Sequence, residues 1–315
     1  MPSPVRLTLD RPVDAIAAPF VLAATRGLYR AEGLIVSTNV ASGSKETIAR
    51  VASGASDVAL ADLNVLIRSR DTADAAPVKA VFVLLNKAPY AVVARRSRGV
   101  TSLASLDGKT MGVADGDLAI RLWPALAKRN NIKLTHVKQE KISAAVREPM
   151  LSAGQVDAVT GFSYISPVNL RDRGVPAADL AVFRFADYGS AAYGLSIVVN
   201  PKFAAEKPEA LRAFLRAITN GTRIAIKEPV QAIDEVVSAM ENGAQDLELE
   251  RLRAVIADSI LTDDVKRDGL GGVDATRFDA AVEEIAEDHT FRKRPALADI
   301  FDDSFLPPAA VRSLK

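Results

Sequence analysis

Five acidic side chains stand in predicted loops next to the ends of short strands, where they can accept hydrogen bonds from a ligand. They are Asp10, Asp62, Asp115, Asp117 and Glu140. No lysine or arginine falls within these loops, and only Lys45 and Lys141 stand at their edges. Unpaired carboxylates repel an oxyanion and accept hydrogen bonds from N–H donors. The pattern therefore disfavours nitrate, bicarbonate and simple sulfonates, and it favours an amine-bearing or neutral hydrogen-bonding solute.

The same residues have structural interpretations that remain open. Asp62 directly precedes a helix predicted over residues 63–70, so it can cap that helix. Asp115 and Asp117 lie in one predicted turn, where turn and cap roles are the alternative. Ser42-Gly43-Ser44 precedes the helix predicted over 45–53. The free N–H groups at the N-terminus of this helix can bind an anion, and the alternative is that this segment is a plain N-cap.

Aromatic side chains at predicted loop positions form a second candidate feature. They are Phe20, Phe162, Tyr164, Tyr188 and Tyr193. Aromatic faces can sandwich a planar ring, with each stack contributing roughly 0.5–1.5 kcal/mol. Packing beneath the loops is the alternative, and it applies most to the two phenylalanines because they carry no hydroxyl group. Asn64 and Ser163 stand in the same loops and add further polar groups.

The composition excludes several classes of function. The chain has no cysteine and only two histidines, His136 and His289. Disulfides, thiol nucleophiles and cysteine metal sites are therefore excluded, and a histidine-based site has little material. We expect no catalytic residue, no metal and no cofactor. Forty basic residues stand against 39 acidic ones, and no basic stripe marks a nucleic-acid surface. No run approaches the ~18 apolar residues of a membrane span.

Two segments of the chain share one pattern and indicate a duplicated unit. In residues 51–62 a helical run ends at Gly54, and Asp57 opens a short apolar strand. Residues 151–162 repeat this order with Gly154 and Asp157. A helix that ends at glycine and feeds a buried strand is typical of α/β folds. We therefore predict two α/β lobes with mostly parallel sheets, whose ligands lie beyond the carboxyl ends of the strands.

The elements predicted from periodicity follow this order. Strands are expected at 5–9, 34–40, 57–61, 78–85, 88–95, 109–113, 133–137, 157–161, 180–185 and 192–200. Helices are expected at 19–33, 45–53, 63–70, 118–130, 142–153 and 166–172, and a strand-free extension at 208–227, 229–240, 247–260 and 275–289. Helices without strands cannot build a third sheet, so the extension should pack on the first lobe. His136 lies within a predicted strand, and Trp123 is predicted to lie in the core.

Residues 19–34 resemble the opening helix of extracytoplasmic solute-binding proteins of ABC importers. The branch is the nitrate/sulfonate/taurine and thiamine-pyrimidine-precursor group, which has a type II periplasmic-binding fold. Similar runs are residues 43–48, the two Gly–Asp segments, residues 105–110 and residues 200–203. The resemblance covers residues 5–240. It implies two lobes joined by two crossovers that close over a small-molecule solute.

The resemblance also implies the organisation and partners of the protein. Lobe one is expected to comprise residues 1–88 and 197–315, lobe two residues 89–196, with a ligand cleft between them. The expected partners are the solute and an ABC importer membrane permease. We expect a monomer in the periplasm, reached by an export signal that has since been removed. The expected ligand-binding residues are Asp10, Phe20, Ser42, Gly43, Ser44, Asp62, Asn64, Asp115, Ser163, Tyr164, Tyr188 and Tyr193.

The predicted function is that of the solute-binding component of an ABC importer, which captures a small polar, ring-containing or amine-bearing molecule similar to an aminopyrimidine. Three alternatives remain at this point. The first is a sulfonate, taurine or nitrate ligand. The second is an enzyme similar to the eukaryotic pyrimidine-precursor synthase, although this chain lacks that enzyme's cysteine-rich run. The third is a sensing module of a transcription regulator, which requires a helix-turn-helix of ~60 residues ahead of the first strand.

Overall fold

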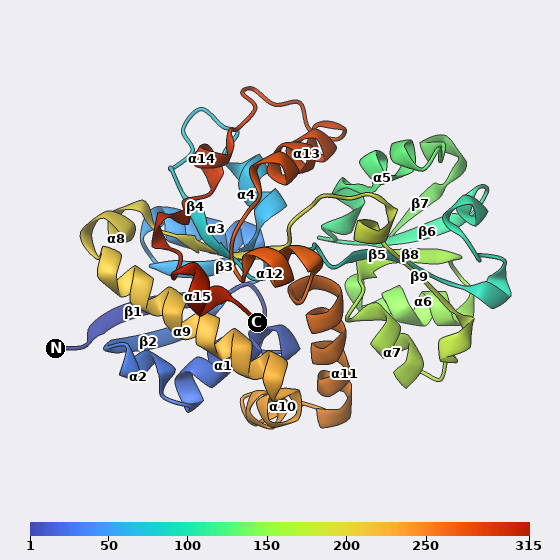
Figure 1. The fold of residues 1–315 in the computed structure, drawn as a ribbon. Helices are drawn as coiled ribbons and strands as arrows, with labels where there is room; N and C mark the ends of the chain where they lie inside the picture. Colours follow the sequence, from blue (N-terminus) through green and yellow to red (C-terminus); the bar gives the residue numbers. More distant parts are fainter. The chain divides into compact units, whose positions relative to one another are not determined.

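The computed structural model describes residues 1–315 and divides into two compact units. Unit 1 comprises residues 1–87, 193–282 and 291–315, and unit 2 comprises residues 88–192 and 283–290. The sequence prediction placed residues 283–290 in lobe one and placed the second boundary at 196. Each unit contains one five-stranded sheet with helices packed around it (Figure 1).

The sheet of unit 1 has the strand order β2-β1-β3-β10-β4. Its strands are β1 (Ser3–Leu9), β2 (Leu34–Val40), β3 (Val58–Asp62), β4 (Lys79–Val83) and β10 (Leu195–Val199). Strand β10 is antiparallel to both β3 and β4, and the other neighbours run parallel. All residues of β3 and β10 are buried, as expected for continuous apolar runs at the centre of a covered sheet.

Helices of unit 1 come from both ends of the chain. The first group is α1 (Ala18–Thr25), α2 (Leu28–Ala31), α3 (Ser44–Ser53) and α4 (Leu63–Ser69). The second group is α8 (Pro201–Glu206), α9 (Pro208–Lys227), α10 (Pro229–Ser238), α11 (Gln245–Val255), α12 (Asp263–Asp268), α13 (Ala275–Ala286), α14 (Leu297–Ile300) and α15 (Ala309–Arg312). The last turn of α13 belongs to unit 2. Helices α8–α12, α14 and α15 belong to unit 1.

Helix α9 is the long yellow helix of Figure 1 and packs directly on α1. Gly221 permits the close approach, because a Cβ atom there would lie 2.3 Å from the carbonyl oxygen of Pro19. Apolar side chains repeat along one face of α9, and Leu211, Phe214 and Ile218 are fully buried. The extension is thus part of the core of unit 1.

The sheet of unit 2 has the analogous order β7-β6-β8-β5-β9. Its strands are β5 (Tyr90–Arg95), β6 (Thr110–Ala114), β7 (Lys138–Ile142), β8 (Ala158–Phe162) and β9 (Leu180–Arg184). Its α-helices before residue 193 are α5 (Trp123–Arg129), α6 (Arg147–Ala153) and α7 (Ser166–Asp172). Strand β5 is antiparallel to β8 and β9, whereas β6 is parallel to β7 and β8. The predicted α/β class is confirmed, and each sheet is mixed, with two parallel and two antiparallel strand pairings.

The repeated glycine and aspartate have equivalent structural roles in the two units. Gly54 and Gly154 both end a helix in the left-handed region, with φ of 80° and 76°. The Asp57 carboxylate accepts a hydrogen bond from the backbone N–H of Arg6 at 2.8 Å. The Asp157 carboxylate accepts one from the N–H of Thr110, also at 2.8 Å. Each aspartate therefore links the start of one strand to the parallel strand beside it.

One predicted strand was wrong. A 3-10 helix at Leu134–His136 occupies the predicted strand 133–137, and the strand lies at Lys138–Ile142 instead. Strand β7 is an edge strand with mostly exposed residues, so its polar sequence lacks the apolar alternation on which the prediction depended. His136 is therefore outside the sheet, and its Nδ1 lies 2.9 Å from the Asp107 carboxylate. Trp123 is fully buried, as predicted.

Candidate functional site

Six of the predicted residues in unit 1 form one hydrogen-bonded chain at the carboxyl ends of β1 and β3. The backbone N–H of Gly43 donates to the carbonyl of Asp10 at 2.7 Å. The Asp62 N–H donates to the Ser44 hydroxyl at 2.9 Å. The Asn64 side chain links Asp62 Oδ1 at 3.1 Å to the carbonyl of Tyr193 at 2.8 Å. These hydrogen bonds therefore connect residues from four separate segments of unit 1.

Asp62 is a helix cap in this structure. It is buried, and its Oδ1 accepts from the N–H groups of Asn64 at 2.8 Å and Val65 at 3.3 Å. The structure therefore gives Asp62 the capping role, which fixes its side chain on the first turn of α4. By contrast, α3 has Gly43 at its N-cap and no side-chain cap, so Ser44 orders the loop of Asp62 instead.

Asp10 is the acid of unit 1 that keeps an acceptor without a partner. Its side chain is 5% exposed, and Oδ1 is buried without a hydrogen bond. Its other oxygen lies 3.4 Å from Nη2 of Arg11. Burial raises the pKa of Asp10 above its ordinary value, and Arg11 opposes that rise. An unsatisfied buried carboxyl oxygen at a strand end is suited to accept an N–H group from a ligand.

Two further carboxylates surround the same strand end. Burial raises the pKa of Asp14 to about 6, and the negative charges of Glu248 and Asp10 add to the rise. Glu248 is buried and accepts from the Ala15 N–H at 2.9 Å. Arg11 lies 3.8 Å from Asp14. The prediction of an acidic set is therefore incomplete, because Arg11 lies directly among these acids.

The side chain of Tyr193 has two polar partners within unit 1. Its hydroxyl accepts from the Asp274 N–H at 2.9 Å, and the Arg277 guanidinium lies 3.8 Å above its ring. The side chain is buried, and burial raises its pKa. The Arg277 guanidinium and the Tyr193 ring therefore form a cation–π contact.

In unit 2, the carboxyl ends of β6 and β8 carry a second polar cluster. Asp117 accepts from the Ala119 N–H at 2.9 Å and from the Thr160 hydroxyl. Burial raises the pKa of Asp117, whereas these bonds and the charge of Arg147 lower it. Ser163 is buried, and its hydroxyl oxygen has no partner. Asp117 thus caps a turn, and it also accepts a hydrogen bond from the Thr160 hydroxyl of strand β8.

Arg147 is the residue of unit 2 that the sequence analysis missed. It begins α6, and its Nε donates to the buried Glu148 at 3.2 Å, while Glu148 accepts from the Ser166 hydroxyl at 2.9 Å. A Cβ on Gly161 would lie 3.5 Å from Arg147 Nη1, so the guanidinium covers that glycine of β8. The structure gives the two Nη groups no acceptor. They can donate to a ligand oxygen.

Aromatic rings form a continuous stack beside this cluster. Tyr164 stacks on Phe162 with ring centroids 5.9 Å apart, and Phe162 stacks on Tyr90 at 6.0 Å. Tyr164 is 1% exposed, so packing accounts for its ring. Tyr188 is half-buried and meets Phe183 edge-on at 5.9 Å. The three predicted aromatic residues of unit 2, Phe162, Tyr164 and Tyr188, are therefore divided between two separate ring groups.

The remaining predicted residues lie apart from these clusters. Phe20 is buried within α1, Ser42 is exposed and donates its N–H to Glu46, and Asp115 is exposed after β6. Glu140 lies within the edge strand β7 rather than in a loop. None of the helices combines the length and the hydropathy that a membrane span requires.

Each unit thus has an α/β sheet with a polar cluster at the carboxyl ends of its parallel strands. Solved structures with a similar fold include binding proteins of ABC importers. The periplasmic aliphatic sulphonate-binding protein SsuA of Escherichia coli matches with a TM-score of 0.75 and 13% identity, over 95% of this chain and 92% of that one. A ligand-binding component of an ABC-type import system of Staphylococcus aureus matches with a TM-score of 0.72 and 13% identity, over 98% and 99%.

Sequence similarity places the chain in a family. The model of the NMT1/THI5 like family matches residues 15–232, and the chain belongs to this family. A 4-amino-5-hydroxymethyl-2-methylpyrimidine phosphate synthase of Schizosaccharomyces pombe is 25% identical over 76% of this chain and 70% of its own length. The riboflavin-binding protein RibY of Chloroflexus aurantiacus is 29% identical over 69% of this chain and 61% of its own length. The predicted resemblance is confirmed at the level of fold and family.

Proposed function

We propose that this chain is the solute-binding component of an ABC importer, acts outside the cytoplasmic membrane and delivers its solute to a membrane permease. The solute is a small polar molecule that contains a ring or an amine, similar to an aminopyrimidine. The family membership and the fold of the ABC binding proteins support the class of function. The names of the relatives, a pyrimidine synthase and a riboflavin-binding protein, support a nitrogen heterocycle.

The unpaired oxygen of Asp10 is the observation that carries the solute class. It is a buried acceptor at a strand end, and a ring N–H or amino group supplies the donor that the protein does not. A hydrogen bond to a charged group contributes roughly 1.5–3 kcal/mol, whereas a buried acceptor that stays unsatisfied costs a similar amount. An N–H donor is therefore selected over an oxyanion at this position.

Arg147 favours a second candidate solute class. Its free Nη groups can bind a sulfonate or a carbonyl oxygen. Repulsion of an oxyanion by carboxylates is therefore expected near Asp10, whereas Arg147 would attract an oxyanion in unit 2. Isothermal titration with an aminopyrimidine, riboflavin, taurine, an alkanesulfonate and nitrate separates the two classes. The proposal expects saturable binding of a heterocycle with N–H groups. Tight binding of taurine or nitrate alone would show that the protein binds oxyanions and would refute the heterocycle proposal.

An enzyme of the pyrimidine-precursor synthase type is the third candidate, because several relatives are named as synthases. Its test is the chemical fate of the ligand. The binding proposal expects that the solute recovered after denaturation is unchanged. Formation of a new compound from any candidate solute or from the protein's own side chains would favour the enzyme.

A further inference from the structure

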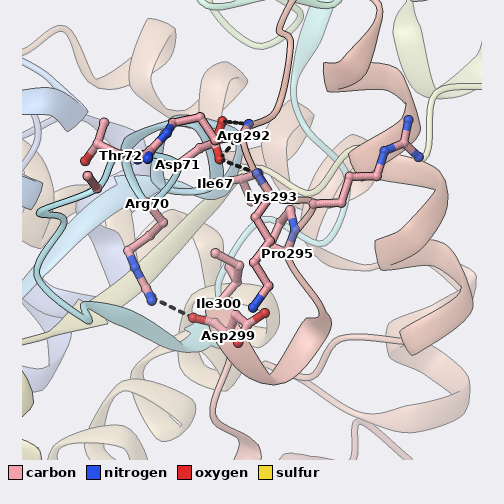
Figure 2. A pocket seen from close by; sticks show the side chains of 11 residues that line it. Ile67, Arg70, Asp71, Thr72, Arg292, Lys293, Pro295, Asp299 and Ile300 are labelled. Carbon is pink, nitrogen blue, oxygen red and sulfur yellow. Dashed lines mark hydrogen bonds between the residues drawn. The ribbon is translucent and has the colours of Figure 1, made fainter.

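A pocket of 380 Å³ lies in unit 1, well away from the polar chain at the strand ends. Helix α4 begins after Asp62, and its seven residues extend for about 10 Å. Arg70 therefore lies at the opposite end of α4, where the chain turns toward the amino end of β4. Figure 2 shows Arg70 on one side of the pocket and Arg292 and Lys293 on the other.

The walls of the pocket carry more positive than negative charge. Its charged residues are Arg70, Arg292, Lys293, Arg294, Asp71 and Asp299. The Asp71 carboxylate accepts the backbone N–H groups of Arg292 at 2.9 Å and Lys293 at 3.2 Å (Figure 2). The side chains of Arg292 and Lys293 form no ion pair, so their charges are available to a ligand.

Arg70 is fixed in place yet lacks a counter-anion contact. Its Nη1 donates to the carbonyl oxygens of Val78 and Asp299, both at 2.6 Å. Its Nε is buried and has no hydrogen-bond partner. Burial lowers the pKa of Arg70, and the negative charge of Asp299 opposes that fall only in part. An anion in the pocket would offset the remaining fall.

We propose that this pocket binds the phosphoryl group of a small phosphate ester or diphosphate. A phosphoryl group presents several oxygens, which can accept from a guanidinium fork and an ammonium group at the same time. The buried side chains of Ile67 and Ile300 supply an apolar wall for the rest of the ligand. The volume lies within the range of roughly 300–1,000 Å³ that is typical of small-molecule sites. The site is separate from the proposed solute site and does not depend on it.

Titration with pyrophosphate tests the proposal, with AMP and inorganic phosphate as further probes. The test variant is Arg292→Ala/Lys293→Ala, which removes two exposed side chains and keeps the backbone N–H groups that Asp71 accepts. The matched control is Lys207→Ala/Lys227→Ala, which removes the same charge from exposed positions of unit 1 that do not line the pocket. The test variant should bind pyrophosphate at least about tenfold more weakly than the control, which is about 1.4 kcal/mol.

Three outcomes would overturn the proposal. They are an absence of saturable pyrophosphate binding to the unaltered protein, an equal loss of affinity in both double variants, and binding of anionic lipid vesicles in place of pyrophosphate. Equal losses would show that overall charge alone attracts the anion. Each double variant should retain the affinity of the unaltered protein for the heterocyclic solute, which separates a failure here from a failure of the proposed function.

Discussion

The substitution Asp10→Asn tests the role of the unpaired carboxyl oxygen, because it changes charge while it keeps shape. In the unaltered protein this side chain is 5% exposed, Oδ1 has no partner, and Oδ2 has only the long contact of 3.4 Å to Arg11. The solute should supply the missing donor. Loss of a charge-assisted bond of roughly 1.5–3 kcal/mol predicts an affinity about 10- to 150-fold lower.

The same substitution should leave the fold intact or make it more stable. Burial raises the pKa of Asp10, which shows that the folded state disfavours the charged form. Isothermal titration with the best heterocyclic solute measures the affinity, and thermal unfolding at neutral pH measures the stability. Asp107→Asn is the control, since that carboxyl group is 63% exposed. An affinity of Asp10→Asn within twofold of the control would refute the reasoning.

Three further predictions concern stability. Because the pKa of Asp14 is raised from 3.8 to about 6, the unfolding free energy should fall as the pH rises from about 4 to about 6. This fall amounts to up to about 3 kcal/mol, and it should be absent in Asp14→Asn. Urea unfolding at several pH values measures it, and an unchanged pH profile in the variant would contradict the raised pKa of Asp14. Arg147→Ala should lower the unfolding free energy by about 1–3 kcal/mol, since it leaves the buried Glu148 without its cation. Arg147→Ala combined with Glu148→Gln should recover part of the loss, and simple addition of the two effects would count against the pair. Gly221→Ala should cost about 1–3 kcal/mol in thermal unfolding, because its Cβ would lie 2.3 Å from the Pro19 carbonyl; a neutral effect would show that α9 and α1 are less tightly packed.

Much of the fold was predictable because the sequence pattern has local physical causes. The repeated glycine and aspartate indicated two similar sheets, and each pair has the same role at a helix end and a strand start. Helix α9 matched its predicted bounds, since Pro208 sits at its first position and one face is apolar. Strand β7 could not be located, because an exposed edge strand has little apolar pattern.

The site was less predictable than the fold, because the role of each polar side chain depends on hydrogen-bond partners that are distant in the sequence. Asp62 is a cap and Tyr164 is packed, so both have structural roles that the sequence left open. Arg147 was missed because it was placed inside a helix predicted over 142–153. Pro149 was the available signal, since proline favours the first turn of a helix and the helix in fact begins at Arg147. Arg11 was omitted although it directly follows Asp10.

The most direct test of the account is native mass spectrometry of the protein saturated with the heterocycle that binds best. Binding without chemistry predicts one solute per chain in the native spectrum. It also predicts that the solute released on denaturation has its original mass, and that the protein mass does not change. Release of a new compound, a covalent change in the protein, or an absence of any retained heterocycle would contradict the account.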